Sequence, residues 1–355
     1  MFKYLLILII KGSALAYPDQ PVETTTLLND YQEISVTIQT FDKGIKVKCF
    51  NSVLVDNDNI KWFLTEDGIV SFDGDKWLFH NKNKKIPKKD IQDIVLDNSP
   101  SGGGIWFASA GGAALASLPL NSKSAATLYN TGNAPLLSNN ILAVATGKSP
   151  IRWFGTDKGI SAFGNDKWLK NSYQRKYRER MFAEFPITSM ATTPHGDSLY
   201  VGTDGAGVAR VYRDNIDAVS GASEYAQWGP IDIPSDNVYS ICITPDGTQW
   251  FGTDRGVARH IGQRTLSNWT VFNTGNGLVN DYVQAIAFDE NGILWFGTKG
   301  GLCSFDGKVW KSYTANEGLS SNNILCVAID KNNIVWCGTD NGVISFNNGL
   351  FTIYK

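Results

Sequence analysis

Seven short turns of the sequence carry many of the side chains that could bind a ligand. Each turn follows a tetrapeptide of the type Trp-Phe-Gly-Thr and leads into a glycine. The charged and amide residues of these turns are Glu66, Asp67, Asp157, Lys158, Asp204, Asp254, Arg255, Lys299, Asp340 and Asn341. Together such groups can hydrogen-bond a polar ligand such as a sugar. They also satisfy backbone groups within turns, so a purely structural role stays open for each of them.

A second set of positions lies just before a strand-like apolar run in each repeat of this pattern. Its members are Cys49, Asp90, Asn140, Pro186, Asn237, Tyr282 and Asn323. Asn and Asp before a strand often serve only the local backbone, which is the alternative to a binding role here too.

No catalytic motif accompanies these residues. His80, His195 and His260 fall in unrelated repeats, and no serine nucleophile motif occurs. A glycosidase needs two carboxyl groups at a set separation, which a sequence does not specify. The cysteines and histidines lack zinc-site spacing, and phosphate-binding and calcium-binding loops are absent from the sequence. We therefore predict no metal and no cofactor, and we favour binding over catalysis.

The tetrapeptide before each turn recurs seven times. Its copies begin at Trp62, Trp106, Trp153, Tyr200, Trp250, Trp295 and Trp336, at intervals of 41 to 50 residues. A period in this range is typical of solenoids, propellers and repeat arrays.

One repeat, residues 281–313, indicates what each unit contains. Four short apolar runs are separated by turns rich in Gly, Asp and Asn, and no run has a helical period of useful length. Four antiparallel strands repeated seven times predict an all-β fold, a seven-bladed β-propeller over residues 45–355. We expect the glycine of the tetrapeptide where neighbouring blades crowd together, and its aromatic residue between blades. Residues 34–41 resemble a further strand, which could join the last blade beside or outside residues 350–354 and close the ring.

The propeller places both sets of polar positions on one face. In a four-stranded blade, the turn between the second and third strands reaches the same face as the connection to the next blade. We therefore predict that the two sets line one funnel of mixed charge. The pairs Asp157-Lys158 and Asp254-Arg255 are the most informative, because the turn itself does not require a basic residue. Tyr225 and Trp228, in the longest repeat, could stack on a sugar, although Trp228 could equally be an ordinary outer-strand aromatic.

Composition narrows the class of partner. The chain has 355 residues, 32 of them Lys or Arg and 34 Asp or Glu, for a formal net charge of −2. Apolar residues make up 43%, enough for a sizeable core. The balanced charge lacks the basic excess that nucleic-acid binding requires, so we predict no nucleic-acid partner.

The N-terminus predicts export. Residues 1–16 combine a basic start, a short apolar run and an Ala-x-Ala end, the parts of a secretory signal peptide. Residues 17–44 then form an N-terminal segment before the propeller. No later run is long and apolar enough to span a membrane. We expect a periplasmic or extracellular bacterial protein.

The last repeats are similar to a known family. Residues 318–330 (Gly-Leu-Ser-Ser-Asn-Asn-Ile-Leu-Cys-Val-Ala-Ile-Asp) with residues 334–342, and residues 277–301 as a second copy, resemble the two-component regulator propeller repeat. In that family, such propellers form the periplasmic sensor part of bacterial receptors, often for polysaccharide fragments. Those receptors usually add a second propeller, an immunoglobulin-like module, a membrane span and a kinase. This sequence contains none of them, so the resemblance implies a stand-alone recognition propeller rather than direct signalling.

Three functional hypotheses follow. We favour an exported recognition propeller that binds a glycan or a protein partner through the funnel without catalysis. The first alternative is a carbohydrate-active enzyme or lyase on the same scaffold. Propeller lyases acting on streptogramins favour a Trp-Phe-Thr-Glu type of signature, which only residues 62–66 approach. The second alternative is a scaffold for protein–protein interaction, because propellers support all three functions.

Overall fold

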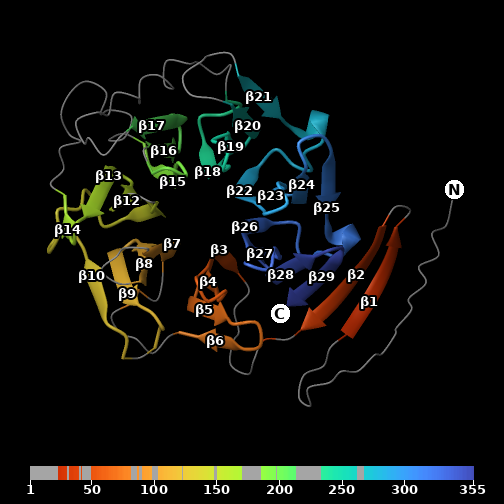
Figure 1. Cartoon of the computed structure of the whole chain (residues 1–355), viewed down its shortest axis with the longest axis horizontal. Coiled ribbons are helices and arrows are strands. Elements are labelled where there is room, and N and C mark those ends of the chain that lie inside the picture. Colours follow the sequence, from red (N-terminus) through yellow and green to blue (C-terminus); the bar gives the residue numbers. More distant parts are fainter. Residues whose placement is uncertain are drawn as a thin grey trace.

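The structure, a computed structural model, forms a ring of seven β-sheet blades around a central axis (Figure 1). It describes residues 23–29, 32–39, 41, 49–80, 86–87, 90–97, 103–121, 123–147, 150–169, 185–196, 198–212, 233–261 and 268–355. The predicted all-β, seven-bladed propeller is therefore confirmed. No helix in these ranges is long and apolar enough to cross a membrane.

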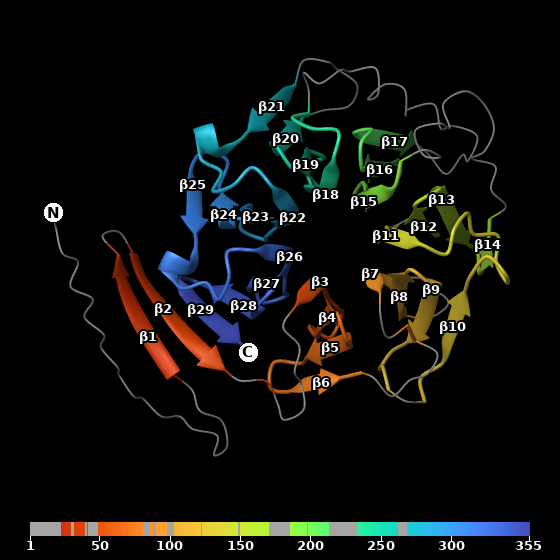
Figure 2. The same ribbon diagram turned by 180° about the vertical axis from the view of Figure 1, so that it is seen from behind.

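Each blade takes its strands in chain order, with the first strand innermost in both views (Figures 1 and 2). Blade 1 consists of β3 (Phe50–Val55), β4 (Lys61–Thr65), β5 (Gly68–Phe72) and β6 (Trp77–Phe79). Blade 2 consists of β7 (Ile91–Asp97), β8 (Gly104–Ser109), β9 (Gly112–Ser117) and β10 (Ala126–Tyr129). Blade 3 consists of β11 (Ile141–Ala145), β12 (Ile151–Thr156), β13 (Gly159–Gly164) and β14 (Lys167–Trp168). Blade 4 has three strands among the described residues, β15 (Ile187–Thr192), β16 (Ser198–Thr203) and β17 (Val208–Tyr212).

Blades 5 to 7 are the most regular. Blade 5 consists of β18 (Val238–Ile243), β19 (Gln249–Thr253), β20 (Gly256–His260) and β21 (Trp269–Phe272). Blade 6 consists of β22 (Val283–Phe288), β23 (Leu294–Thr298), β24 (Gly301–Phe305) and β25 (Trp310–Tyr313). Blade 7 consists of β26 (Ile324–Ile329), β27 (Val335–Thr339), β28 (Gly342–Asn347) and β29 (Leu350–Tyr354). Single-turn 3-10 helices, η1 (Thr274–Asn276) and η2 (Ala315–Glu317), follow β21 and β25.

The apolar core lies between the blades. Seven clusters of buried side chains each join two neighbouring blades, so every blade interface of the ring has one. At four of the interfaces, the tetrapeptide aromatic residue of one blade contacts the phenylalanine of the next. Trp106 lies 5.0 Å from Phe154 and Trp250 lies 5.8 Å from Phe296, both edge-on. The prediction that these aromatic residues fill the space between blades is confirmed.

The glycine of the tetrapeptide lies where two blades crowd, as predicted. A Cβ atom at Gly338 would lie 2.4 Å from the carbonyl oxygen of Phe50 in blade 1. At Gly252 it would lie 2.3 Å from Ser240 Oγ and 2.8 Å from a methyl group of Val283 in the next blade. These separations are too short for any side chain without a shift of the neighbouring blade.

Two N-terminal strands extend the last blade. Strand β2 (Gln32–Gln39) pairs in parallel with β29, and β1 (Glu23–Asn29) pairs outside β2, so that this sheet has six strands. The Phe41 amide then donates to the Lys355 carbonyl at 2.7 Å, and the Phe41 ring contacts Phe50 and Trp77 of blade 1. The chain therefore joins blade 7 to blade 1 from both ends. Residues 1–16, with the expected signal peptide, lie outside the described residues.

Candidate functional site

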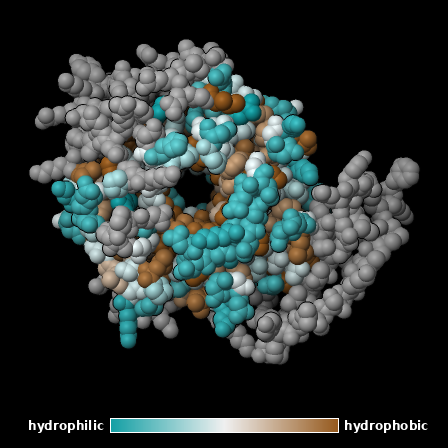
Figure 3. Space-filling model, in the orientation of Figure 1, coloured by the Kyte–Doolittle hydropathy of each residue, from teal (hydrophilic) through white to brown (hydrophobic). Residues whose placement is uncertain are grey.

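The two predicted sets of polar residues meet at one end of the blades. The amides of Ala110, Asp157, Asp204 and Lys299, in the second turn of blades 2, 3, 4 and 6, donate to the carbonyls of Asp90, Asn140, Pro186 and Tyr282, at 3.1, 3.3, 2.9 and 3.1 Å respectively. We call this end of the ring the funnel face. Figure 3 shows that a channel opens at the centre of the ring, with hydrophilic residues along part of its border.

A buried hydroxyl shapes each of these turns. The last residue of the tetrapeptide, Thr or Ser, donates to the carbonyl of the turn glycine in all seven blades. In blade 5, Thr253 Oγ1 donates to Gly256 at 2.8 Å and accepts from the Arg255 amide at 3.0 Å. Gly256 has a φ of 120°, and a Cβ there would lie 2.4 Å from the Phe272 carbonyl. The backbone therefore fixes the turn, and the side chains of its middle residues remain available for other contacts.

The predicted residues of blades 4 and 5 lie in contact. The Asn237 amide group donates to Asp254 Oδ2 at 2.9 Å, and the Asn237 backbone forms an isolated bridge with Asp204. Burial acts to raise the pKa of Asp254, but hydrogen bonds from Ser235 and Asn237 outweigh it and lower that pKa below its usual value. Asp254 is therefore a carboxylate at neutral pH. Its Oδ1 atom is shielded from solvent and has no hydrogen-bond partner among the described residues, and the same holds for Asp157 Oδ1.

Two stacked tyrosines continue this surface into blade 6. The Tyr239 and Tyr282 rings are 4.9 Å apart and inclined by 21°. Lys299 Nζ lies 3.5 Å from the centre of the Tyr282 ring, a cation–π contact. Burial, followed by the hydrogen bond with Tyr282, raises the pKa of Tyr239 well above its usual value, so its hydroxyl stays neutral.

An amide and carboxylate network connects blade 6 with blade 7. Gln284 Nε2 donates to Asn323 Oδ1 at 2.9 Å, and Asn323 Nδ2 donates to Asp340 Oδ2 at 3.0 Å. Ser321 Oγ donates to the other oxygen of Asp340 at 2.6 Å. Asn341 Nδ2 donates to the Ser320 carbonyl at 3.0 Å. These hydrogen bonds hold the side chains of the network in fixed positions.

The remaining predicted residues of the described part of the chain lie on the funnel face with fewer contacts. Burial raises the pKa of the Cys49 thiol, and the charges of Glu66 and Asp340 raise it further, which places Cys49 near both carboxylates. Asp67 and Asp90 are exposed. Lys158 and Arg255 are exposed, and neither forms an ion pair with a described residue. Tyr225 and Trp228 lie outside the described residues.

Repeat spacing did not single out Tyr239, Gln284 and Ser321, which also lie on this face. Tyr239 and Gln284 are each the second residue of an inner strand, directly after a fully buried valine. Since strand side chains alternate between faces, this position could have been recognised as the more exposed one. In the described part of the chain, no group of three or more His, Cys, Asp or Glu residues could hold a metal ion.

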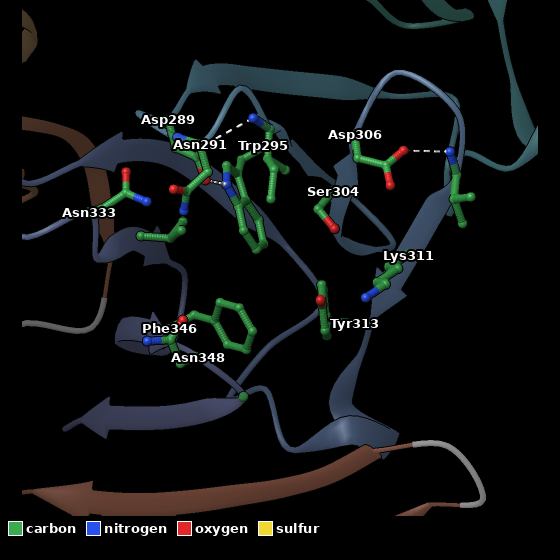
Figure 4. A pocket seen from close by; sticks show the side chains of 14 residues that line it. Asp289, Asn291, Trp295, Ser304, Asp306, Lys311, Tyr313, Asn333, Phe346 and Asn348 are labelled. Atoms are coloured by element: carbon green, nitrogen blue, oxygen red, sulfur yellow. Dashed lines mark hydrogen bonds between the residues drawn. The ribbon is translucent and has the colours of Figure 1, made fainter.

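Two cavities lie at the other end of the ring. One, of about 310 Å³, lies between blades 6 and 7 and is lined by Trp295, Ser304, Asp306, Tyr313 and Phe346 among others (Figure 4). The other, of about 590 Å³, is lined by turns after inner strands, including Asp56, Glu290, Asp330 and Lys331. Neither contains a residue of the predicted funnel set.

Sequence comparison identifies a repeat family. Residues 277–300 and 318–341 match the family model described as two component regulator propeller. Both matches span an inner strand and the tetrapeptide of blades 6 and 7. No curated protein is significantly similar to the chain.

Solved structures confirm the architecture. The extracellular domain of hybrid two component system BT3049 from B. thetaiotaomicron has a TM-score of 0.69 and 21% identity, covering 86% of this chain and 39% of its own. PorZ, a surface component of the type-IX secretion system of Porphyromonas gingivalis, has a TM-score of 0.66 and 16% identity, over 91% and 50%. Virginiamycin B lyase from Staphylococcus aureus has a TM-score of 0.57 and 13% identity, over 92% and 98%. At these identities the likeness concerns the fold, and the chain spans half or less of the first two proteins.

Proposed function

We propose that this chain, which carries two component regulator propeller repeats on a seven-bladed ring, is an exported recognition module. It would bind a glycan through its funnel face without transforming it. Sensor domains of this repeat family share the fold. Export agrees with the signal-like residues 1–16.

The observation that carries the proposal is the surface around Tyr282. It combines an aromatic pair, a lysine on the ring of Tyr282 and anionic Asp254 nearby, all held by contacts within the protein. A sugar has apolar faces that stack on aromatic rings and hydroxyls that need both donors and acceptors. A preformed surface with a few fixed polar groups beside aromatic rings is suited to that chemistry.

The test is a binding screen with variants. The purified chain is titrated by calorimetry with plant, host and microbial oligosaccharides, and the same samples are examined for product. Tyr282→Ser removes the ring that stacks on Tyr239 and that lies under the Lys299 ammonium. We expect it to weaken binding by about tenfold, from contacts worth roughly 1–2 kcal/mol. Lys299→Ala should weaken it less. Lys76→Ala, an exposed lysine in the turn at the other end of blade 1, is the matched control and should not change affinity.

The outcomes separate the hypotheses. Binding that Tyr282→Ser weakens and Lys76→Ala leaves unchanged, with no product, supports the proposal. Product formation would replace it with a carbohydrate-active enzyme or lyase. An absence of binding across the panel, with capture of a protein partner that Tyr282→Ser abolishes, would move the proposal from glycan to protein recognition.

A further inference from the structure

The repeats of the ring can be aligned on the aromatic residue that begins each tetrapeptide. In each blade, one residue of the third strand lies directly opposite this aromatic residue. It is Arg210 opposite Tyr200, Arg259 opposite Trp250, Ser304 opposite Trp295 and Ser345 opposite Trp336. Blades 4 to 7 therefore share one geometry at this place but differ in what covers the ring.

A cation of the chain covers the ring in three of these four blades. The Arg210 guanidinium lies 5.7 Å from the centre of Tyr200, and that of Arg259 lies 5.7 Å from Trp250. Above Trp336 of blade 7, the cation is Lys61 from blade 1, with its ammonium 5.1 Å from the ring. Such contacts are stabilising by about 1–2 kcal/mol when the cation is withdrawn from water.

Blade 6 has the same ring without a cation. Ser304 replaces the arginine, and Val335 of blade 7 stands where blade 1 has Lys61. No cation of the described residues lies over the Trp295 ring. Instead, the cavity of about 310 Å³ lies there, and both Ser304 and Val335 line it. The space that a cation of the chain fills in blades 4, 5 and 7 is therefore open in blade 6.

The lining of the cavity suits a cation. Figure 4 shows Trp295, Tyr313 and Phe346 around the space. Phe346 lies 5.3 Å from Trp295 and 5.1 Å from Tyr313, so the three rings form one aromatic cluster. Aromatic walls of this kind are used to bind organic cations.

Two carboxylates and one lysine complete the lining. Asp289 accepts the Trp295 indole N–H at 2.9 Å, as Asp330 does for Trp336 at 3.0 Å. In blade 7 that aspartate also pairs with Lys61 Nζ at 3.8 Å, whereas its counterpart Asp289 forms no ion pair with a described residue. Asp306 adds a second carboxylate and Lys311 one ammonium, so the formal charge of the lining is one negative unit.

We propose that this blade 6–7 cavity binds an alkylguanidinium group, such as an arginine side chain of a peptide, over the ring of Trp295. The bound guanidinium would occupy the place that Arg259 takes in blade 5 and would lie beside Asp289, as Lys61 lies beside Asp330. The site is separate from the funnel face and does not depend on the function proposed there.

Calorimetric titration of the full chain tests this. The probes are agmatine, the capped peptide Gly-Arg-Gly and the same peptide with citrulline, which is neutral and nearly isosteric with arginine. We expect agmatine and the arginine peptide to bind, the citrulline peptide to bind at least about tenfold more weakly, and affinity to fall with added salt. Stronger binding of the peptide than of agmatine would identify a peptide as the source of the group, and equal binding would identify a small guanidinium compound.

Three variants make the test specific. Ser304→Arg supplies the guanidinium from the chain, as blade 5 does, and should abolish probe binding while the protein remains folded. Asp306→Asn keeps an acceptor for the turn amides of Lys308 and Val309, and should weaken binding by several-fold. Lys311→Gln removes a like charge and should strengthen it.

The sign of the Lys311 effect decides between ligand classes. Tighter binding of the arginine peptide to Lys311→Gln supports a cation site. Equal binding of the arginine and citrulline peptides, or full binding by Ser304→Arg, would overturn the proposal. The proposal would also be overturned if a neutral or acidic sugar bound the parent protein without competing with either peptide, and if this sugar no longer bound Ser304→Arg.

Discussion

A single buried hydroxyl supports each turn on the funnel face. Thr298 Oγ1 donates to the Gly301 carbonyl at 2.7 Å and accepts from the Gly300 amide at 3.0 Å. Valine has nearly the same shape but can make neither bond. Thr298→Val should therefore lower the free energy of unfolding by about 2 kcal/mol, because two buried backbone groups lose their partner. Urea denaturation measures this. Thr127→Val, at an exposed position of β10, is the control and should change it by less than about 0.5 kcal/mol.

Asp93 should make stability depend on pH. Its carboxyl accepts from the Val144 amide of blade 3 at 2.9 Å, and burial raises its pKa to about 6. The folded state then holds a proton that the unfolded state releases between about pH 4 and 6, so the free energy of unfolding should fall as pH rises through that window.

The variant Asp93→Asn isolates this effect. It keeps an acceptor for Val144 but cannot titrate. The free energy of unfolding of the variant minus that of the parent should therefore rise by on the order of 2 kcal/mol from pH 4 to pH 7. Asp73 has the opposite character, because backbone hydrogen bonds lower its pKa. Asp73→Asn should not reproduce the gain. A difference between the Asp93 variant and the parent that is constant with pH would refute the assignment.

At the level of single residues, repeat position predicted a shared face for residues far apart in the sequence. Asn237 with Asp254, Asn323 with Asp340 and Tyr282 with Lys299 were all assigned to one face from spacing alone, and each pair is in contact. Repeat spacing marks the turns and the residue before each inner strand. Tyr239 and Gln284 lie within the strand, at its bulge, so spacing alone did not single them out.

At the level of elements, neighbouring blades meet through positions that tolerate no side chain. At Gly338 the nearest atom to an added Cβ is a backbone oxygen of blade 1, which cannot rotate away. Gly338→Ala should therefore destabilise the protein by about 3 kcal/mol through overpacking. Gly103→Ala has open space around it and serves as the control, with little change expected. Thermal unfolding of both variants checks this, and similar melting temperatures would contradict the account of the interface.

The repeat period also predicted the strands, because turns rich in glycine, aspartate and asparagine separate most of them. Two features were beyond the sequence argument. Strand β1 pairs outside β2, although nothing in residues 23–29 distinguishes an edge strand from an irregular segment. The cavity between blades 6 and 7 arises from Ser304 and Val335, which are ordinary strand residues until they are compared with the arginines and lysine of other blades.

At the level of the whole molecule, ring closure depends on residues from both ends of the chain. Phe41 is buried between blades 7 and 1, with Trp77 at 4.8 Å and Phe50 at 5.6 Å. Phe41→Ala should cost about 3–4 kcal/mol and increase amide exchange in β3 and β29 more than in blades 3 to 5. Leu78→Ala, at an exposed site of blade 1, is the control. Uniform faster exchange around the ring would argue against a local closure.

The ring presents two chemically different ends. The funnel face combines carboxylates, amides and stacked tyrosines, whereas the other end contains the cavities and the turns that follow the inner strands. On the two proposals above, the ring would bind a glycan at one end and a guanidinium group at the other. Variants at one site should then leave binding at the other unchanged.

The most direct test of the account is the location of glycan binding on the ring. Hydrogen exchange of the full chain, measured with and without the tightest oligosaccharide of the panel, reports it segment by segment. We predict slower exchange in the turns that carry Asp254, Lys299 and Asp340 and in the segments before β18 and β22, with no change around Asp289 and Asp306. Protection confined to the Asp289 and Asp306 turns, with the funnel face unchanged, would contradict the central claim.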